Sequence, residues 1–142
     1  MKSNILIVEA PFYPEISRLL LDGATAALER GDAYFDSVSV TGALEIGPVI
    51  QFAMKGGEHG GKSYDGFVAL GCVIRGETYH FELVANESGA AVTRVSLDHG
   101  VPIANAVLTC ENEAQATARA DDKGRDAARA AVEMANLLDD WS

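Results

Sequence analysis

Three short apolar runs, each followed by a stretch with helical periodicity, constrain the fold of this chain more than any other feature. NILIVEA, GFVALGCVI and VPIANAVLT occupy residues 4–10, 66–74 and 101–109. Nearly continuous apolar runs of this length are typical of strands that are covered on both faces. A more polar, β-prone segment occupies residues 33–40. Strands that alternate with helices predict an α/β fold with a parallel sheet and right-handed crossovers.

The first half of the chain carries signals for two helices. Residues 15–30 place apolar side chains at helical spacing, and we expect Gly31 to end this helix as a left-handed cap. Residues 41–55 predict a glycine-containing turn and a short helix with Pro48 in its first turn. The polar, glycine-rich stretch GGEHGGKSYD that follows is expected to be a loop.

The second half of the chain predicts three further helices. A long helix is expected from about Thr78 to Asp98, with Gly100 closing it. After the last strand, Asn112 can cap a short helix that runs through Ala120. A separate helix is then expected over residues 124–140. The whole pattern therefore has four strands, each followed by helical sequence.

Composition limits the classes of protein to which the chain can belong. With 142 residues, 48% of them hydrophobic, we expect one domain covering residues 1–142. A formal charge of −10 disfavours nucleic acid and anionic membranes as partners. No signal peptide or 18-residue apolar run is present, and Cys72 and Cys110 have no metal-binding spacing. We therefore expect a soluble, cytoplasmic protein without a bound metal.

Four corners of the predicted fold are candidates for a binding site. Ligands of parallel α/β sheets bind beyond the carboxyl ends of the strands. This rule selects residues 11–13, 41–45, 75–80 and 109–112. Any ligand site should therefore combine residues from several of these short segments.

The corner VIRGETYH has the composition of an anion site. We expect the amides of Gly76, Glu77 and Thr78 to be the unpaired donors of the long helix, with Thr78 as a possible cap. His80 would lie in the first turn, where the positive helix end favours the neutral imidazole that can act as a base. Taken alone, the residues favour a surface histidine at the helix end over a catalytic one, and they assign no role to Arg75.

A second motif, GGEHGGKS at residues 56–63, matches the G-x-x-x-x-G-K-S pattern of phosphate-binding loops. Such a loop must follow a strand and open a helix, whereas Lys62 and Ser63 lead into a predicted strand. We therefore interpret the match as coincidental and expect a loop with a solvated Lys62.

Five stretches together resemble the 6,7-dimethyl-8-ribityllumazine synthase family over essentially the whole chain. They are APFYPEIS (10–17), GALEI (42–46), GCVIRGETYHFELVANES (71–88), LTCENEAQATARA (108–120) and KGRDAARAAVEMANL (123–137). The resemblance implies a flavodoxin-like three-layer α/β/α domain with a four-stranded parallel sheet. It also implies at least a homopentamer whose active sites are shared between neighbours.

The implied reaction has two small-molecule substrates and requires no cofactor. It condenses 5-amino-6-ribitylamino-uracil with 3,4-dihydroxy-2-butanone 4-phosphate and releases phosphate and water. On the pyrimidine side, Phe12 would stack on the ring, and Asn105 stands where many members have a second aromatic residue. The ribityl chain and the ring pocket would be contacted by Ala43, Leu44, Glu45, Val73 and Ile74.

The resemblance also implies roles around the phosphate. Glu77 and Thr78 would bind it through their amides and the threonine hydroxyl, and Arg119 of a neighbouring subunit would clamp it. His80 would move protons, while Lys123 of the neighbour would reach the heterocycle. Only these roles and the substrate names come from the family, because the corner itself was selected from helix polarity.

Several positions depart from the commonest family pattern. Thr41 replaces a usual proline, Gly47 predicts a delayed start of the second helix, and the loop over residues 119–123 is expected to be short. Together with the short segment before the first strand, that loop favours an isolated pentamer over a shell. These departures, and Asn105, leave an alternative open: a catalytically weak homologue that binds flavin or lumazine or serves in assembly.

Overall fold

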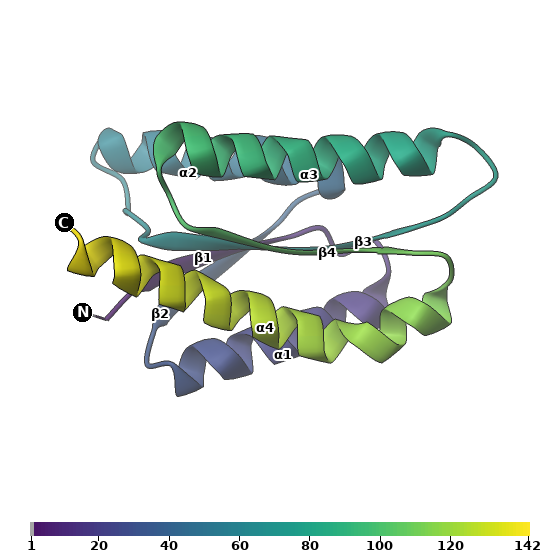
Figure 1. Ribbon diagram of the computed structural model, residues 1–142, viewed down its shortest axis with the longest axis horizontal. Coiled ribbons are helices and arrows are strands. Elements are labelled where there is room, and N and C mark those ends of the chain that lie inside the picture. The colour runs from purple at the N-terminus through teal and green to yellow at the C-terminus, as the bar shows by residue number, and fades with distance from the viewer. Residues whose placement is uncertain (1) are drawn as a thin grey trace.

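One four-stranded parallel sheet lies between two layers of helices in the computed structural model, which describes residues 2–142 (Figure 1). The strand order is β2-β1-β3-β4, the order of a flavodoxin-like sheet. This confirms the predicted fold. The strand bounds are β1 Asn4–Glu9, β2 Tyr34–Ser39, β3 Gly66–Ile74 and β4 Ile103–Cys110.

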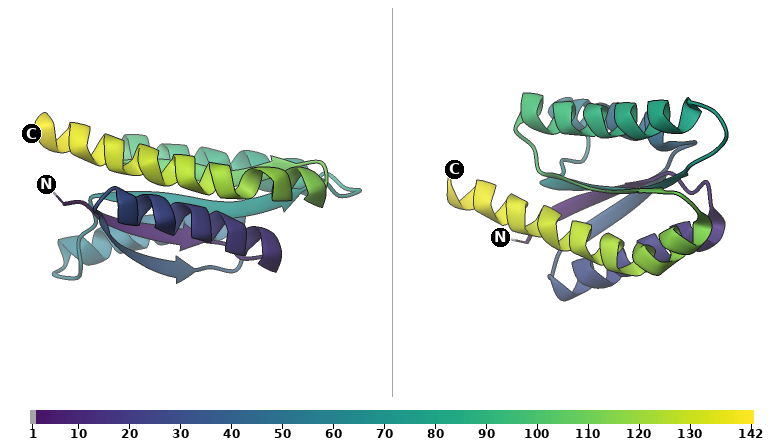
Figure 2. Two further views of the ribbon diagram at one scale, coloured as in Figure 1. Left: turned by 90° about the horizontal axis from the view of Figure 1, so that it is seen from below. Right: turned by 45° about the vertical axis from the view of Figure 1, so that its right-hand side comes forward.

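The helices cover both faces of the sheet in pairs. Figure 1 shows α1 and α4 on one face and α2 and α3 on the other. Both termini lie at the end of the sheet where the strands begin, which Figure 2 shows from two further directions. The helix bounds are α1 Pro14–Arg30, the 3₁₀ helix η1 Ala43–Glu45, α2 Ile46–Glu58, α3 His80–His99 and α4 Glu113–Asp140.

Strand β1 explains why the apolar runs are continuous. Successive side chains of a strand point to opposite faces, so Ile5 and Ile7 pack in the cluster under α1 and α4. Leu6 and Val8 pack in the cluster under α2 and α3. The edge strand β2 is mostly exposed, which accounts for its polar sequence.

The C-terminal region forms one 28-residue helix, so the prediction of two helices was wrong. Asn112 caps it as expected, its Oδ1 accepting a bond from the Gln115 amide at 2.9 Å. Gly124 does not break the helix, because it lies at a close crossing with α1. A Cβ there would come within 2.2 Å of the Leu20 carbonyl oxygen. Residues 119–123 lie within this helix, so the expected loop does not exist. The expectation of an isolated pentamer, which was based partly on that loop, therefore loses this support.

Two other predicted helix boundaries also differ from the structure. Gly31 has a φ of −78° and is not a left-handed cap; Asp32, with φ 54°, takes that conformation instead. Helix α2 begins at Ile46, so Gly47 does not delay its start. Gly47 is buried in this helix, where an added Cβ would lie 2.9 Å from the Ala91 Cβ of α3. Gly100 closes α3 in the left-handed region, as predicted.

The motif over residues 56–63 lies between a helix and a strand. Its first three residues belong to the last turn of α2, so the prediction that the whole stretch is a loop was wrong. Lys62 is half-exposed and donates to Asp36 Oδ2 at 2.7 Å, which ties the connection to β2. The element directly before the motif is the helix α2, and the element directly after it is the strand β3. A phosphate-binding loop needs the opposite order, so its context is missing, as predicted.

Candidate active site

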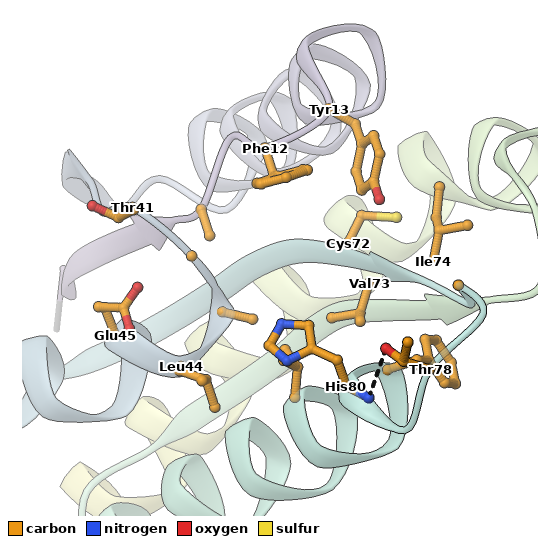
Figure 3. A pocket seen from close by; sticks show the side chains of 16 residues that line it. Phe12, Tyr13, Thr41, Leu44, Glu45, Cys72, Val73, Ile74, Thr78 and His80 are labelled. Atoms are coloured by element: carbon orange, nitrogen blue, oxygen red, sulfur yellow. Dashed lines mark hydrogen bonds between the residues drawn. The ribbon is translucent and has the colours of Figure 1, made fainter.

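A cavity of about 330 Å³ opens at the carboxyl ends of β1, β2 and β3 (Figure 3). Three of the four predicted corners supply its walls: residues 11–13, 41–45 and 75–80. Within the described residues 2–142, the fourth corner contributes no lining side chain. The volume falls in the range of about 300–1,000 Å³ that is usual for small-molecule sites.

The wall that follows β1 carries an exposed aromatic ring. Phe12 is 68% exposed, which excludes the interpretation that it belongs to the core. Its ring meets Tyr13 edge to face, with centroids 5.0 Å apart. Because one face of the Phe12 ring has no packing partner in the core, the ring is available to stack on a flat ligand.

The wall that follows β2 is a tight turn made by residues 42–45. Gly42 is extended, with φ −154°, and its carbonyl accepts a bond from the Glu45 amide at 3.1 Å. Ala43 is buried, whereas Leu44 and Glu45 are exposed at the cavity. The turn therefore presents both backbone and a carboxylate to the same space.

The wall that follows β3 is a turn leading into α3. The helix begins at His80, two residues later than expected, and Tyr79 rather than Thr78 is its N-cap. Thr78 Oγ1 still accepts from the His80 amide, at 3.4 Å. The amides of Gly76, Glu77 and Thr78 therefore precede the helix instead of belonging to its first turn. They donate to no acceptor within residues 2–142.

The His80 imidazole projects into the cavity, between Thr78 and the segment carrying Leu44 and Glu45 (Figure 3). Free amides at the start of α3 make the nearby wall attractive to an anion. No lysine or arginine of residues 2–142 lines the cavity. An anion bound there would therefore meet amides, hydroxyl groups, the His80 imidazole and the helix end, but no lysine or arginine of residues 2–142.

The apolar floor of the cavity includes the thiol of Cys72. Burial, followed by the charges of Cys110 and Glu113, raises the pKa of Cys72 to about 12. Burial likewise raises the pKa of Tyr13 above its ordinary value. Both groups consequently stay neutral near neutral pH and behave as uncharged walls.

Three predicted site residues lie away from the cavity. Asn105 is exposed on β4, where its Oδ1 accepts from the Val107 amide at 2.8 Å. It shares a shallow groove between β4 and α4 with Lys123. Arg119 is exposed on α4 and donates to the Gln115 carbonyl at 2.9 Å. These three residues could contact a ligand in such a cavity only if they came from a neighbouring copy of the chain.

Comparison with known proteins accounts for this combination of sheet, corners and cavity. The family model described as 6,7-dimethyl-8-ribityllumazine synthase matches residues 2–139. The chain belongs to the 6,7-dimethyl-8-ribityllumazine synthase family. The resemblance found in the sequence is thereby confirmed.

Bacterial relatives that carry the family's name match over nearly the whole chain. The 6,7-dimethyl-8-ribityllumazine synthase of Leptothrix cholodnii is 58% identical, covering 98% of this chain and 89% of the relative. The 6,7-dimethyl-8-ribityllumazine synthase 1 of Mesorhizobium japonicum is 54% identical, covering 96% and 85%. The Agrobacterium fabrum protein of the family is 50% identical, covering 96% and 95%.

Sequence reasoning missed part of the cavity of this lumazine synthase family member. Eight predicted residues line it: Phe12, Ala43, Leu44, Glu45, Val73, Ile74, Thr78 and His80. Cys72 and Phe81 also line it and were not predicted. Cys72 shares a strand face with Ile74 and could have been found from that alternation. Glu77, which was predicted, does not line the cavity.

Proposed function

We propose that this protein condenses 5-amino-6-ribitylamino-uracil with 3,4-dihydroxy-2-butanone 4-phosphate to form 6,7-dimethyl-8-ribityllumazine. The observation that carries the proposal is that one cavity is bounded by the Phe12 ring on one side and by His80 and the free amides of residues 76–78 on another. The first wall suits a flat pyrimidine, and the second suits an anion next to a proton carrier. Membership of the family supports the choice of substrates.

The pyrimidine and its ribityl chain occupy the part of the cavity between β1 and β2. Phe12 stacks on the ring, as its exposed position allows. Val73 and Ile74 contact the ring from β3. The turn at Ala43, Leu44 and Glu45 holds the polyol through backbone groups and the carboxylate, which suit hydroxyl donors and acceptors. These contacts to the polyol would fix the orientation of the ring.

The phosphate of the second substrate binds at the turn before α3. The amides around Glu77 and Thr78, together with the threonine hydroxyl, donate to its oxygens. Because no lysine or arginine among residues 2–142 of the same chain lines this cavity, Arg119 of a neighbouring subunit supplies the charge-assisted contact. Lys123 and Asn105 of that neighbour extend the site toward the heterocycle.

The reaction requires orientation and proton transfer. An amine of the pyrimidine attacks the ketone, phosphate leaves, and the second amine closes the ring, with water expelled at each condensation step. His80 takes and returns the protons of these steps. Orientation of two reactants can lower a barrier by about 7–11 kcal/mol in favourable systems, and a positioned proton carrier adds roughly 10²–10⁴-fold. His80 is therefore important but not indispensable.

The active form is a homopentamer of one-domain subunits, residues 1–142, that works in the cytoplasm without a cofactor. Support for a shared site comes from the location of Arg119 and Lys123 on the exposed side of α4 and of Asn105 on the β4 edge. No helix of residues 2–142 has the length and apolar character needed to cross a bilayer.

The direct test incubates purified protein with both substrates and follows the absorbance of the lumazine product. We expect turnover well above the uncatalysed background. A parallel titration with flavin distinguishes the alternative of a weak homologue, for which the departures at Thr41 and Asn105 are the specific observations. Background turnover combined with tight flavin binding would replace the proposed reaction by that alternative.

A further inference from the structure

Arg75, the first residue after β3, makes contacts to two separate segments. Its amide donates to the Cys110 carbonyl at 2.9 Å and so extends the pairing of β3 with β4. Its Nε donates to Glu111 Oε2 at 2.5 Å, and its Nη1 bonds to Glu82 Oε1. The guanidinium also lies over the ring of Phe81, 4.6 Å from the centroid.

These contacts connect the corner after β4 with the first turn of α3. Glu111 lies just before α4, whereas Glu82 and Phe81 belong to the start of α3. Phe81 lines the cavity, but Arg75 does not. Two carboxylates already engage the guanidinium, so it is not a free ligand for a bound anion.

The turn over residues 76–80 has few contacts of its own. All five residues are exposed. A Cβ placed on Gly76 would meet no atom within 4 Å, and the hydrogen bond from His80 to Thr78 is long, at 3.4 Å. A turn with so little packing depends for its shape on the residues at its two ends. Arg75 is the residue directly before it.

We propose that Arg75 is a positioning residue that holds the turn over residues 76–80 in the shape that receives the phosphate of the substrate. It acts through Glu82, Glu111 and Phe81 and touches neither substrate. The inference rests on the proposed function, since it concerns the same phosphate.

Arg75 also balances negative charge beside the turn. Without it, Glu82 and Glu111 would be two uncompensated carboxylates next to an anion site, on a chain whose formal charge is already −10. Like charges at short range weaken the binding of an anion. Loss of Arg75 thus acts on the phosphate in two ways, through mobility of the turn and through repulsion.

The test compares Arg75→Met with the unmodified protein in steady-state kinetics. We expect KM for butanone phosphate to rise roughly tenfold, as for loss of one charge-assisted contact, with KM for the pyrimidine nearly unchanged. Inhibition by inorganic phosphate should weaken by a similar factor. Arg75→Lys should recover only part of the loss, because an ammonium cannot replace the planar fork between two carboxylates.

Arg18→Met is the matched control. Arg18 also pairs with two carboxylates, Glu15 at 2.7 Å and Asp22 at 3.4 Å, but on the exposed face of α1. Its replacement should leave both KM values unchanged. Arg75→Gln, which keeps a polar side chain but no charge, provides a milder second variant if Arg75→Met does not fold, and it should raise KM for the phosphate substrate in the same direction.

Three results would overturn the inference while leaving the proposed function intact. These are an unchanged KM for butanone phosphate in both Arg75→Met and Arg75→Gln, an equal rise of KM for the two substrates, and full recovery by Arg75→Lys. Absence of turnover in the unmodified protein would instead refute the proposed function. The two failures are therefore distinguishable.

Discussion

At the residue scale, the cavity combines one imidazole with a turn of free amides and, within residues 2–142, no cation of its own chain. This arrangement separates proton transfer from charge compensation. His80 would carry the first task, and Arg119 of another subunit would carry the second. Replacing either residue should therefore affect a different kinetic parameter.

His80→Ala should lower kcat by an order of magnitude or more, in line with the contribution of a positioned proton carrier. KM for butanone phosphate should change little, because amides and the Thr78 hydroxyl remain. Steady-state kinetics with both substrates measures kcat and KM, and an unchanged kcat would remove His80 from the mechanism.

Glu82→Gln should reveal a pH-dependent contribution to stability. The hydrogen bond from Arg75 holds the pKa of Glu82 below its ordinary value, with further help from its own backbone amide. Such a carboxyl stabilises the fold at pH above its unfolded-state value, and the contribution is lost as pH falls through the folded-state value. The substitution should therefore lower the free energy of unfolding at neutral pH. The difference in this free energy between the two proteins should become smaller as the pH falls. Urea unfolding of both proteins from pH 7 downward tests this; a difference independent of pH would contradict it.

At the element scale, the crossing of α1 and α4 depends on two glycines at which the helices touch. A Cβ on Gly124 would lie 2.2 Å from the Leu20 carbonyl oxygen, and one on Gly23 would lie 2.3 Å from the Asp121 carbonyl oxygen. Backbone oxygens cannot turn away as the ends of flexible side chains can. Any larger residue must therefore push the helices apart.

Gly124→Ala should destabilise the protein although alanine is the better helix former. The helix would gain about 1 kcal/mol from propensity, whereas forced overpacking costs about 1–3 kcal/mol and more where backbone must move. Gly89→Ala in α3 is the matched control, because a Cβ there meets nothing within 4 Å. Chemical denaturation should show a loss for Gly124→Ala and a small gain for Gly89→Ala. Equal gains would mean that the crossing is not tight.

At the scale of the whole molecule, the groups assigned to one site lie in two places on the chain. Phe12 and His80 line the cavity, whereas Arg119 and Lys123 lie on the exposed face of α4. Arg119→Ala should raise KM for butanone phosphate strongly, since a charge-assisted bond is lost, and should leave KM for the pyrimidine nearly unchanged. Normal phosphate binding in this variant would exclude Arg119 from the site.

Mixing His80→Ala with Arg119→Ala tests whether sites are shared. If each site takes His80 from one subunit and Arg119 from its neighbour, random mixed assemblies should contain unmodified pairs at roughly a quarter of their sites. After the two variants are unfolded and refolded together, the activity should exceed the sum of the activities of the two variants refolded separately. Light scattering should give the mass of a pentamer, and an active monomer without complementation would refute the shared site.

Local patterns in the sequence predicted the sheet and most of one cavity. The strands β1, β3 and β4 were found because burial on both faces makes each run apolar, and the corners followed because parallel strands end at one edge. The segments that carry Phe12, Thr78 and His80 were assigned to that edge on this basis, and all three residues line the cavity. Such features depend on the residues within one segment and on the direction of the chain.

Contacts between distant segments required the folded molecule. Gly124 looks like a helix breaker in the sequence, yet it is the point where α4 meets Leu20 of α1. The role proposed for Arg75 depends on Glu82 and Glu111, whose side chains converge only when β3 and β4 pair. The periodicity of apolar residues indicates which face of a segment is buried. It does not indicate which other segment covers that face, because this depends on how the elements pack in the folded molecule.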